Sequence, residues 1–588
     1  MSFSATPIRF IAGVNPEPDE TKQNTRHIID GDNIRFYRGG VQKIGGHATE
    51  VVDTTIQGCP RSVLSFTDAN NNTWTVIGTH LKLYAKQGSA VTNITPLQTS
   101  GATLGTDPLA LISGDKTMTV TYTSHGLAVG DRIGMSGATH GTGGFAAANI
   151  NVEHIVDTVP DANTFTVELA AVAPATDATE GGAAVVVKKE IAAGEKDAVA
   201  ASGPWVGVPW TGLPYNIQTD TSLFIQPRIW WMDTFGDKWV GGAGNGGKCY
   251  QWDGDIAAAP TIITNAPDAD WGWVEDAKLV TLLGNRVKNS NTGDFTDWTV
   301  SAASSAYEDD KEDATKLISR AYANGENLIF ADEGNVFRMR WVGGTVKWLW
   351  EKVSDTVGII SPSGSIAVGG IIYIFAREGL YFYNGGILSP LPDNTLIRYM
   401  FDDLNITQRY KCFVWFNQKF NEVCFHYPVS IENDRCTIFS ITEGHYTPRI
   451  IDRTAADTEG QASQFPVLAD SDGILYQHEV GYNDSGDAMN AYCTVAYQAL
   501  QNGKYQTFVE GMEPDLIQEG SLTISLYGKD RATNAGTLLE SFAFPEAGGK
   551  IDCAHEARWR SWEFRNNTVD GFFRIGGMRE FISQGSEF

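Results

Sequence analysis

Apolar and polar residues alternate in short runs along most of the chain, and turns rich in Gly, Asp or Asn separate these runs. This period of two predicts β-strands that bury one face. The 16 Trp, 20 Tyr and 28 Phe residues also favour strands. One segment, residues 394–405, predicts a helix instead. Its apolar residues at helical spacing are Leu396, Ile397, Met400, Phe401 and Leu404.

A weak repeat runs through the chain, in which a polar turn leads into an apolar residue and then an aromatic one. Its copies occupy residues 78–88, 244–254, 332–344, 377–386 and 471–481, with Tyr84, Tyr250, Phe337, Tyr381 and Tyr476 as the aromatic residues. The successive aromatic residues are 166, 87, 44 and 95 positions apart, so 44 fits one unit, while 87 and 95 fit two. Repeats of about 40–50 residues are typical of β-propeller blades of four short strands. We therefore expect an all-β protein with a β-propeller of six or seven blades.

A change of composition explains the large first separation. Residues 100–195 are rich in Ala, Thr and Gly and nearly free of Trp. Within them, residues 120–137 and 157–170 have the alternating pattern of a compact β-barrel or β-sandwich. We expect this small domain to be inserted into the first part of the propeller.

The end of the chain predicts further strands, at residues 521–528 and 558–567. We expect them to form a β-rich platform together with the N-terminal segment. The expected domains are an N-terminal platform hairpin (1–58), a first propeller part (59–99), the inserted β-domain (100–195), the β-propeller (196–483) and a C-terminal β platform domain (484–588).

The stretch DGDNIRFYRGGVQKIGG, residues 30–46, admits two interpretations. Asp30 and Asp32 begin like a calcium loop of the EF type, but Arg35 stands where that loop needs Gly, and no Glu follows at the twelfth position. A strand-turn-strand hairpin fits the alternating pattern better, with a Gly-Gly pair at its turn. We expect a structural hairpin without a ligand.

Composition narrows the classes of function. The net charge of −26 argues against a protein that grips nucleic acid by neutralising phosphates, although it suits a surface that DNA passes without adhering. Seven scattered cysteines without C-x-x-C spacing are expected to be reduced thiols of a protein made in a cytoplasm. The N-terminus has no pattern of a secretory signal, and no apolar run is long enough to predict a membrane span.

Three motifs have a functional interpretation beside a structural one. GAGNGGKC (242–249) resembles a P-loop, but Cys249 replaces the magnesium-binding hydroxyl and a strand follows, which favours a Gly-rich turn. EDDKED (308–313) is either a carboxylate source for glycoside hydrolysis or a solvated acidic loop between two blades. NTGDFTDW (291–298) partly matches the Asp-containing turns of sialidase blades, and such turns are structural.

Other signatures of catalysis are missing from the sequence. The ten His residues show no zinc-binding spacing, and His125 lies at a turn where we expect it to bond to the backbone. There is no G-x-S-x-G elbow and no Cys in a catalytic signature. We expect no enzymatic activity, no catalytic residue, no cofactor and no metal site.

Three segments resemble one family. The stretch IIDGDNIRFYRGGVQKIGG (28–46) resembles the N-terminal hairpin of the tail nozzle proteins, or tail tubular protein B family, of short-tailed bacteriophages. EVCFHYPVSIENDRCTIFSITEGHYTPR (422–449) is similar to a blade of those proteins, although Tyr446 stands where some relatives have Trp. ARWRSWEFRNNTVDGFFRIGGMREFIS (557–583) is similar to their closing strands. Residues 120–170 resemble a small β-domain of phage tail and baseplate proteins.

The resemblance implies a structural virion protein of a short phage tail. It implies a homo-oligomeric ring, usually a hexamer, attached to the adaptor ring below the portal and bearing tail fibres or spikes. Genomic double-stranded DNA would be retained by this nozzle and ejected through it without sequence-specific binding, and assembly would take place in the host cytoplasm. Residues expected at a subunit or adaptor interface are Arg35, Phe36, Arg38, Arg558, Arg560 and Arg565.

Two alternatives stay open. A carbohydrate-binding or glycan-depolymerising propeller of a tail apparatus would need a glycan site, and a carboxylate pair about 5–10 Å apart for hydrolysis. A cellular propeller serving as a protein-binding scaffold would be monomeric and would have no phage partners.

Overall fold

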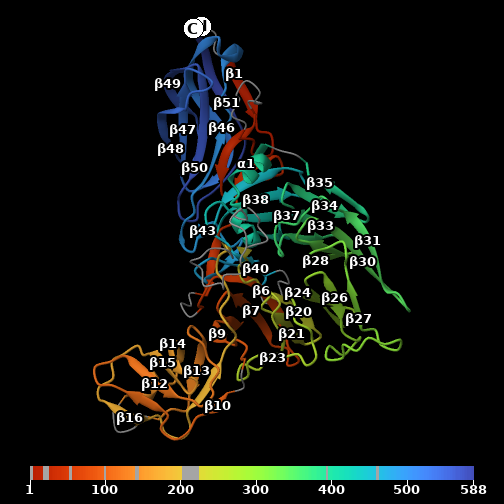
Figure 1. Ribbon diagram of the computed structural model, residues 1–588. Helices are drawn as coiled ribbons and strands as arrows, with labels where there is room; N and C mark the ends of the chain where they lie inside the picture. Colours follow the sequence, from red (N-terminus) through yellow and green to blue (C-terminus); the bar gives the residue numbers. More distant parts are fainter. Residues whose placement is uncertain are drawn as a thin grey trace, which may run out of the picture.

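The computed structural model describes residues 4–16, 26–51, 56–98, 101–139, 145–200, 224–392, 395–457 and 463–587. The described residues form a propeller with a platform at one side and a smaller domain at another (Figure 1). Both chain ends lie at the platform (Figure 1). The fold is all-β with an inserted β-domain and a platform of N- and C-terminal strands, which confirms the fold predicted from the sequence.

Among the described residues, seven sheets form the blades, within the predicted range of six or seven. Blade 1 contains β6 (Pro60–Thr67), β7 (Thr73–Thr79), β8 (Leu83–Gln87) and β9 (Ala90–Asn93). Blade 2 contains β20 (Trp231–Phe235), β21 (Lys238–Gly242), β22 (Cys249–Trp252) and β23 (Thr261–Ile262). Blade 3 contains β24 (Trp271–Glu275), β25 (Lys278–Leu283), β26 (Arg286–Asn289) and β27 (Tyr307–Asp310). Blade 4 contains β28 (Leu317–Ala323), β29 (Glu326–Ala331), β30 (Val336–Gly343) and β31 (Lys347–Ser354).

The remaining blades follow the same order. Blade 5 contains β32 (Ser365–Val368), β33 (Ile371–Phe375), β34 (Leu380–Asn384) and β35 (Ile387–Pro390). Blade 6 contains β36 (Phe413–Asn417), β37 (Glu422–Pro428), β38 (Asn433–Ser440) and β39 (Tyr446–Ile450). Blade 7 contains β40 (Ala455–Ala456), β41 (Val467–Ala469), β42 (Leu475–His478) and β5 (His47–Val51), extended by β43 (Asn483–Asp484) and β44 (Asp487–Ala488).

An N-terminal strand completes the ring of blades. β5 pairs antiparallel with β42, with His47 opposite His478. The boundaries expected at 58 and 483 therefore differ from the structure, because β5 belongs to blade 7 and the short strands β43 and β44 extend that same sheet. Apolar residues of the first and last blades, such as Ile77 and Leu475, share one core, which closes the circle.

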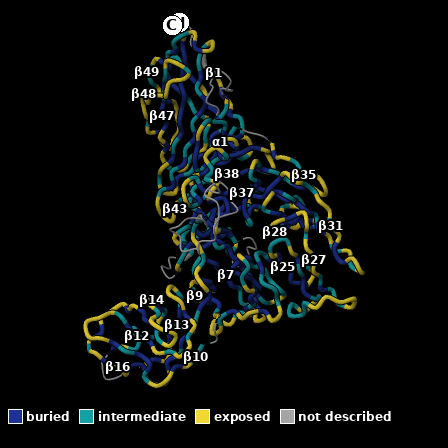
Figure 2. Tube along the Cα trace, in the orientation of Figure 1, coloured by how far each residue is buried: buried dark blue, intermediate teal, exposed yellow. Residues whose placement is uncertain are grey.

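The strands are apolar because neighbouring blades bury both of their faces. The middle strand of blade 5, for example, reads IIYIF (371–375), and four of its five residues are buried. Phe330 of blade 4 and Ile374 of blade 5 belong to one core cluster. Buried residues follow one another through the blades, while the outer turns of the blades are exposed (Figure 2).

One α-helix, α1 (Thr395–Asp403), follows blade 5. It buries Leu396, Ile397 and Met400, which confirms the helical pattern seen in the sequence. A 3-10 segment, η3 (Ile406–Lys411), connects it to blade 6. Figure 1 shows α1 where the platform meets the propeller.

The inserted domain lies between blades 1 and 2 of the chain. Its strands are β10 (Ala102–Thr103), β11 (Leu109–Leu111), β12 (Thr117–Thr121), β13 (Arg132–Ser136), β14 (Glu153–Asp161), β15 (Thr164–Glu168), β16 (Asp177–Glu180) and β17 (Val186–Lys189), with η1 (Ala147–Asn149) before β14. They surround a core of their own, which includes Met118, Ile133 and Phe165. A short pair, β18 (Val199–Ala200) and β19 (Phe224–Ile225), follows this domain.

The platform consists of two sheets that join the chain ends. One sheet contains β1 (Ser4–Arg9), β3 (Ile34–Tyr37), β4 (Gly40–Lys43), β46 (Tyr505–Glu519), β49 (Ile551–Ala557) and β51 (Phe572–Glu587). The other contains β2 (Ile28–Asp32), β45 (Ala491–Val495), β47 (Leu522–Lys529), β48 (Thr537–Phe544) and β50 (Trp559–Asn566). The turn η4 (Leu500–Gly503) precedes β46. The predicted strands at 521–528 and 558–567 correspond to β47 and β50.

Candidate functional site

The three segments that resemble one family meet at the junction of platform and propeller. The hairpin β3–β4 joins the C-terminal strand β51, with Val41 opposite Ile575 and Gln42 opposite Arg574. The same hairpin packs on blade 6, because Phe36 and Phe425 belong to one core that also contains platform residues. We call this contact region, centred on the β3–β4 hairpin, the junction.

A buried arginine lies at the centre of the junction. The Arg35 side chain is 2% exposed, and its Nε and Nη2 atoms donate to Oε1 and Oε2 of Glu422, both at 3.0 Å. Nη1 and Nη2 donate to the two oxygens of Glu479 at 3.0 and 2.5 Å. The guanidinium carbon lies 3.5 Å from the centroid of the Phe420 ring. One cation of the N-terminal hairpin thus binds one carboxylate of blade 6 and one that directly follows β42 of blade 7.

The pKa values of the two carboxylates shift in opposite directions beside the same guanidinium. Burial raises the pKa of Glu422 to about 7, although Arg35 opposes the rise. Burial also acts to raise the pKa of Glu479, but Arg35 and then Arg449 outweigh it and hold that pKa below its ordinary value. Because two buried carboxylates share one guanidinium, one of them stays close to protonation at neutral pH.

Further hydrogen bonds connect the hairpin and the preceding strand β2 to the propeller and the platform. Asp32 Oδ1 accepts from the backbone N–H of Ile450 at 2.8 Å in blade 6. Lys43 Nζ donates to Asn566 Oδ1 at 2.9 Å in the platform. Burial lowers the pKa of Lys43 to about 8. Polar side chains within residues 32–43 therefore bind elements more than four hundred positions later in the sequence.

Three of the six residues expected at an interface between chains are buried within this one. Arg35 has the two partners described above, and Phe36 is 4% exposed with its ring at an edge-to-face distance of 5.0 Å from His445. Arg560 is 3% exposed and donates from Nη2 to Glu580 Oε2 at 2.8 Å. Their charges and rings already pack inside one chain, which differs from the expected role.

The other three lie closer to solvent. Arg38 is exposed, and its backbone N–H donates to Glu443 at 3.0 Å. Arg558 is half-buried against the carbonyl of Gly503, and Arg565 is half-buried and binds Glu563 at 2.8 Å. An interface role for these three arginines stays a prediction.

The structure shows where three further features from the sequence lie: the segment 242–249, His125 and the turn 291–298. The segment 242–249 begins at the last residue of β21 and ends at the first of β22, as a Gly-rich turn should. His125 bonds to the backbone as expected, through the carbonyl of Asp161 at 3.1 Å and the N–H of Leu127 at 2.9 Å. In the turn 291–298, Trp298 Nε1 donates to the carbonyl of Phe295 at 2.8 Å, and the N–H of Gly293 donates to the carbonyl of Ala277 at 2.7 Å.

The acidic segment 308–313 is only partly a loop. Its first three residues belong to β27, the outermost strand of blade 3, rather than to an inter-blade loop. Arg286 pairs with Asp310 at 2.6 Å and with Glu308 at 3.0 Å, which accounts for the position of these carboxylates. Among the residues that the structure describes, no group of three or more His, Cys, Asp or Glu side chains is placed to hold a metal ion.

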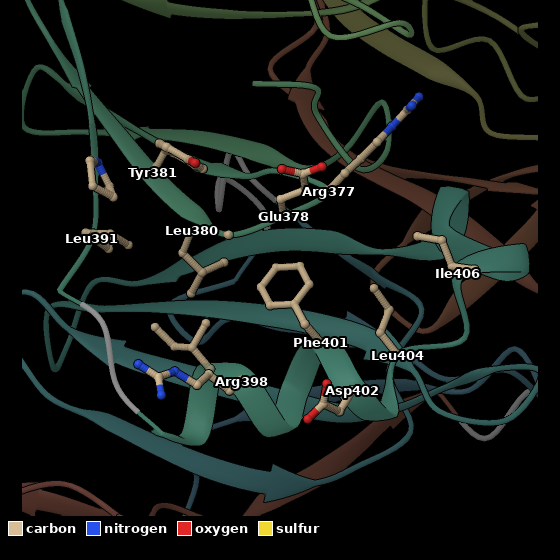
Figure 3. A pocket seen from close by; sticks show the side chains of 13 residues that line it. Arg377, Glu378, Leu380, Tyr381, Leu391, Arg398, Phe401, Asp402, Leu404 and Ile406 are labelled. Carbon is tan, nitrogen blue, oxygen red and sulfur yellow. The ribbon is translucent and has the colours of Figure 1, made fainter. Parts of the chain in front are cut away.

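A groove of about 750 Å³ lies between α1 and blade 5. Figure 3 shows Phe401 of the helix and Leu380 of β34 at its apolar floor. The charged residues on its walls are Arg377, Glu378, Arg398 and Asp402. The ring of Tyr381 adds a flat aromatic surface (Figure 3). This combination suits a polar ligand with an apolar face.

Sequence reasoning missed the two glutamates that hold Arg35. Each one is a single charge beside apolar strand residues, in NEVCF and in HEVG. A charge next to a buried strand needs a partner, so the pattern indicates that partners exist. It does not say which, since Arg35 lies 387 positions from Glu422 and 444 from Glu479.

Comparisons with known proteins give the following findings. No protein-family model matches the chain, and no curated protein matches it. The chain is similar to the computationally designed Ika8 protein, with 11% identity, coverage of 73% of this chain and 99% of that one, and a TM-score of 0.32. It is similar to the WD40 β-propeller domain of Doa1, with 7% identity, coverage of 65% and 97%, and a TM-score of 0.29. For the phage phi92 endosialidase the identity is 11%, the coverage 96% and 70%, and the TM-score 0.16.

These scores are too low to transfer a function, so the class of the protein rests on its own strand order. It is a seven-bladed β-propeller protein with an inserted β-domain and a platform made of both chain ends. In the described part of the chain, no helix is long and apolar enough to cross a membrane.

Proposed function

We propose that this protein is a structural component of a short bacteriophage tail, a ring-shaped nozzle below the portal adaptor that retains packaged DNA and conducts it during ejection. One observation carries the proposal: the three segments that resemble tail nozzle proteins, 28–46, 422–449 and 557–583, meet at one junction. Segments this far apart in the sequence come together only through the overall fold. Their meeting at one site therefore supports a shared architecture rather than a chance match of a local motif.

The proposed ring would provide the DNA channel between its subunits. The axis of the propeller itself is occupied by side chains from every blade, including Trp230, Trp271 and Phe413, around a cavity of only about 180 Å³. Duplex DNA is about 20 Å wide and cannot pass there. The net charge of −26 suits channel walls that repel the phosphate backbone and so let the genome slide.

The proposed partners follow from the same role. An adaptor ring would bind one end of a hexameric ring of this protein, and fibres or spikes would bind the outer surface of that ring. The exposed Arg38 and the half-buried Arg558 and Arg565 are the platform residues that we propose for contacts between chains. The protein would be a virion component assembled in the host cytoplasm, without turnover of a substrate.

A reconstitution experiment tests the proposal. The purified protein is mixed with the adaptor of the same phage, and the mixture is separated by size and imaged. The proposal predicts a stacked complex in which the nozzle ring extends the adaptor channel. Two separate species at micromolar concentrations, under conditions where the adaptor itself forms rings, would contradict it.

The groove beside α1 favours a second candidate, a glycan-binding propeller of a tail apparatus. The aromatic ring of Tyr381 and the charged walls could bind a sugar face and its hydroxyl groups. Binding of host surface polysaccharide that is lost in Tyr381→Ala would support this candidate. Release of reducing sugar that is lost when residues 308–313 are replaced by Ala, in a chain that still forms a ring, would add hydrolysis; the nozzle predicts neither result.

A further inference from the structure

The axial cavity of the propeller is lined by residues of all seven blades. Its volume of about 180 Å³ is far above the roughly 10–15 Å³ that one water molecule needs. Most of its wall is apolar or carries serine hydroxyl groups. Two charged side chains reach it, Arg61 of blade 1 and Arg320 of blade 4, and no Asp or Glu is among the described residues that line it. A cavity with cations alone is unexpected in a chain with a net charge of −26.

Arg61 has hydrogen-bonding capacity left over. Its side chain is 1% exposed, and Nη2 donates to Glu432 Oε2 at 2.7 Å and to the carbonyl of Lys196 at 3.2 Å. Its Nε and Nη1 atoms are buried and have no hydrogen-bond partner among the described residues. Guanidinium N–H groups that are buried without an acceptor are strongly destabilising, so such a group points to an acceptor from outside the chain.

The surrounding charges do not neutralise Arg61. Among the described residues its one carboxylate partner is Glu432, which is shared with Lys411 at 3.3 Å and Lys196 at 3.6 Å. Asp197 is the second carboxylate of this group and binds Lys411 at 2.5 Å. In the part of the chain that the structure describes, three cations thus face two carboxylates beside the cavity. His80 responds to the same environment: burial, and then the positive charges of Arg61 and Lys196, lower its pKa to about 4.

Arg320 supplies the second cation from another blade. Its Nε donates to Asn327 Oδ1 at 2.7 Å, and its nearest carboxylate oxygen, on Glu275, lies 3.7 Å away. The guanidinium also lies 4.7 Å from the centroid of the Tyr322 ring, which holds its plane in position. A planar fork of donors fixed in this way matches the oxygen atoms of a phosphate or a carboxylate.

We propose that the axial cavity is a binding site for a small oxyanion of the phosphate or carboxylate class, held between Arg61 and Arg320. The anion accepts hydrogen bonds from the free N–H groups of Arg61 and balances the excess positive charge. It connects blade 1 to blade 4 across the axis and so stabilises the closed ring of blades. This site is independent of the proposed role in a tail.

Thermal unfolding of the full chain tests the site. Sodium phosphate and sodium succinate are each compared with sodium chloride at matched ionic strength, because oxyanions bound only by the folded state raise Tm. The expected result is a rise of at least about 2 °C with millimolar phosphate or succinate, confirmed by binding heat in calorimetry. The anion that gives the larger rise identifies the class of ligand.

Three variants show where the anion binds. Arg61→Gln and Arg320→Gln should each abolish most of the rise, whereas Arg286→Gln, which removes an exposed arginine of blade 3 that also pairs with carboxylates, should keep it. If Arg61→Gln does not fold, Arg320→Gln and the titration of the unaltered protein still decide. Absence of any rise and binding heat in the unaltered protein, or an equal rise in all variants, would overturn the proposal.

Discussion

Arg35 Nε lies 3.0 Å from Glu422 Oε1, so a side chain of the N-terminal hairpin is fixed to a blade that begins almost four hundred residues later. Glu479 binds the same guanidinium and adds blade 7 to the contact. A buried ion pair contributes little net stability compared with well-packed apolar residues of similar volume. Removal of one member, however, leaves a buried charge without a partner. The contact therefore fixes how the platform sits on the propeller.

Arg35→Met should strongly destabilise the protein. The substitution leaves two buried carboxylates without a cation, and the free energy of unfolding should fall by roughly 3–5 kcal/mol. Urea unfolding monitored by tryptophan fluorescence measures the change. Arg286→Met is the matched control, since its ion pairs are exposed and should contribute little. Equal urea midpoints for the two variants would argue against the junction as a stabilising element.

Glu422→Gln should change how stability depends on pH. Burial raises the pKa of Glu422 from 4.5 to about 7. Between these two pH values the folded chain keeps a proton on Glu422 that the unfolded chain releases. By linkage, the contribution of Glu422 to stability is fully present below its unfolded pKa and falls as pH rises through the folded one. The neutral glutamine avoids that loss. The stability of the variant relative to the unaltered protein should therefore increase between pH 5 and pH 8, by as much as a few kcal/mol.

Glu479→Gln serves as the control for this experiment. Its carboxylate has a lowered pKa in the folded state, so it is ionised in both states above about pH 5. Glu479→Gln should change the pH dependence less than Glu422→Gln does, because it removes only the part of the rise in the Glu422 pKa that the Glu479 charge causes. A constant stability difference for Glu422→Gln between pH 5 and pH 8 would show that Glu422 is not the group that titrates.

The inserted domain should be removable without loss of the propeller. Its two ends run side by side, because the N–H of Gln98 donates to the carbonyl of Lys189 at 2.8 Å. The domain also has its own core. A short Gly-Ser linker in place of residues 101–187 should leave a folded protein with the same near-ultraviolet circular dichroism per tryptophan, since residues 101–187 contain no Trp. Loss of that signal, or aggregation, would show that the propeller needs the insertion.

Gly46→Ala should disturb the packing of the N-terminal segment on the extended sheet of blade 7 through a steric effect. A Cβ at Gly46 would lie 2.2 Å from the carbonyl oxygen and 2.5 Å from the nitrogen of Asn483, so one of the two backbones must move. We expect a loss of about 1–3 kcal/mol in the free energy of unfolding, as for other overpacked sites. Gly105→Ala is the control, because a Cβ there meets no atom within 4 Å. Equal unfolding midpoints for both variants would contradict this close contact.

The repeat predicted the propeller because each of its aromatic residues is the second residue of a third strand. Tyr84 in β8, Tyr250 in β22 and Phe337 in β30 all have this position. Blades 3 and 6 gave no signal, since Val287 and Asp434 stand at that position in β26 and β38. The spacing of the repeat nevertheless indicated these two blades, because a missing aromatic residue leaves the length of a blade unchanged.

The pairing of distant strands could not be predicted in the same way. The pattern of residues 47–51 predicts a strand, but alternation does not identify the sheet that a strand joins, and β5 pairs with β42 of blade 7. The same holds for Arg35, whose sequence neighbours indicate burial but not its partners. The axial cavity also escaped prediction, because its lining comes from one to four residues of each of seven separate blades.

The most direct test of the proposed nozzle is the mass and shape of the purified protein. Light scattering gives the mass, to be compared with 64.0 kDa for one chain, and cryogenic imaging gives the shape. The proposal predicts annular particles of about six copies around a channel at least about 20 Å wide, enough for duplex DNA. A protein that stays monomeric, alone and with the adaptor, would contradict it.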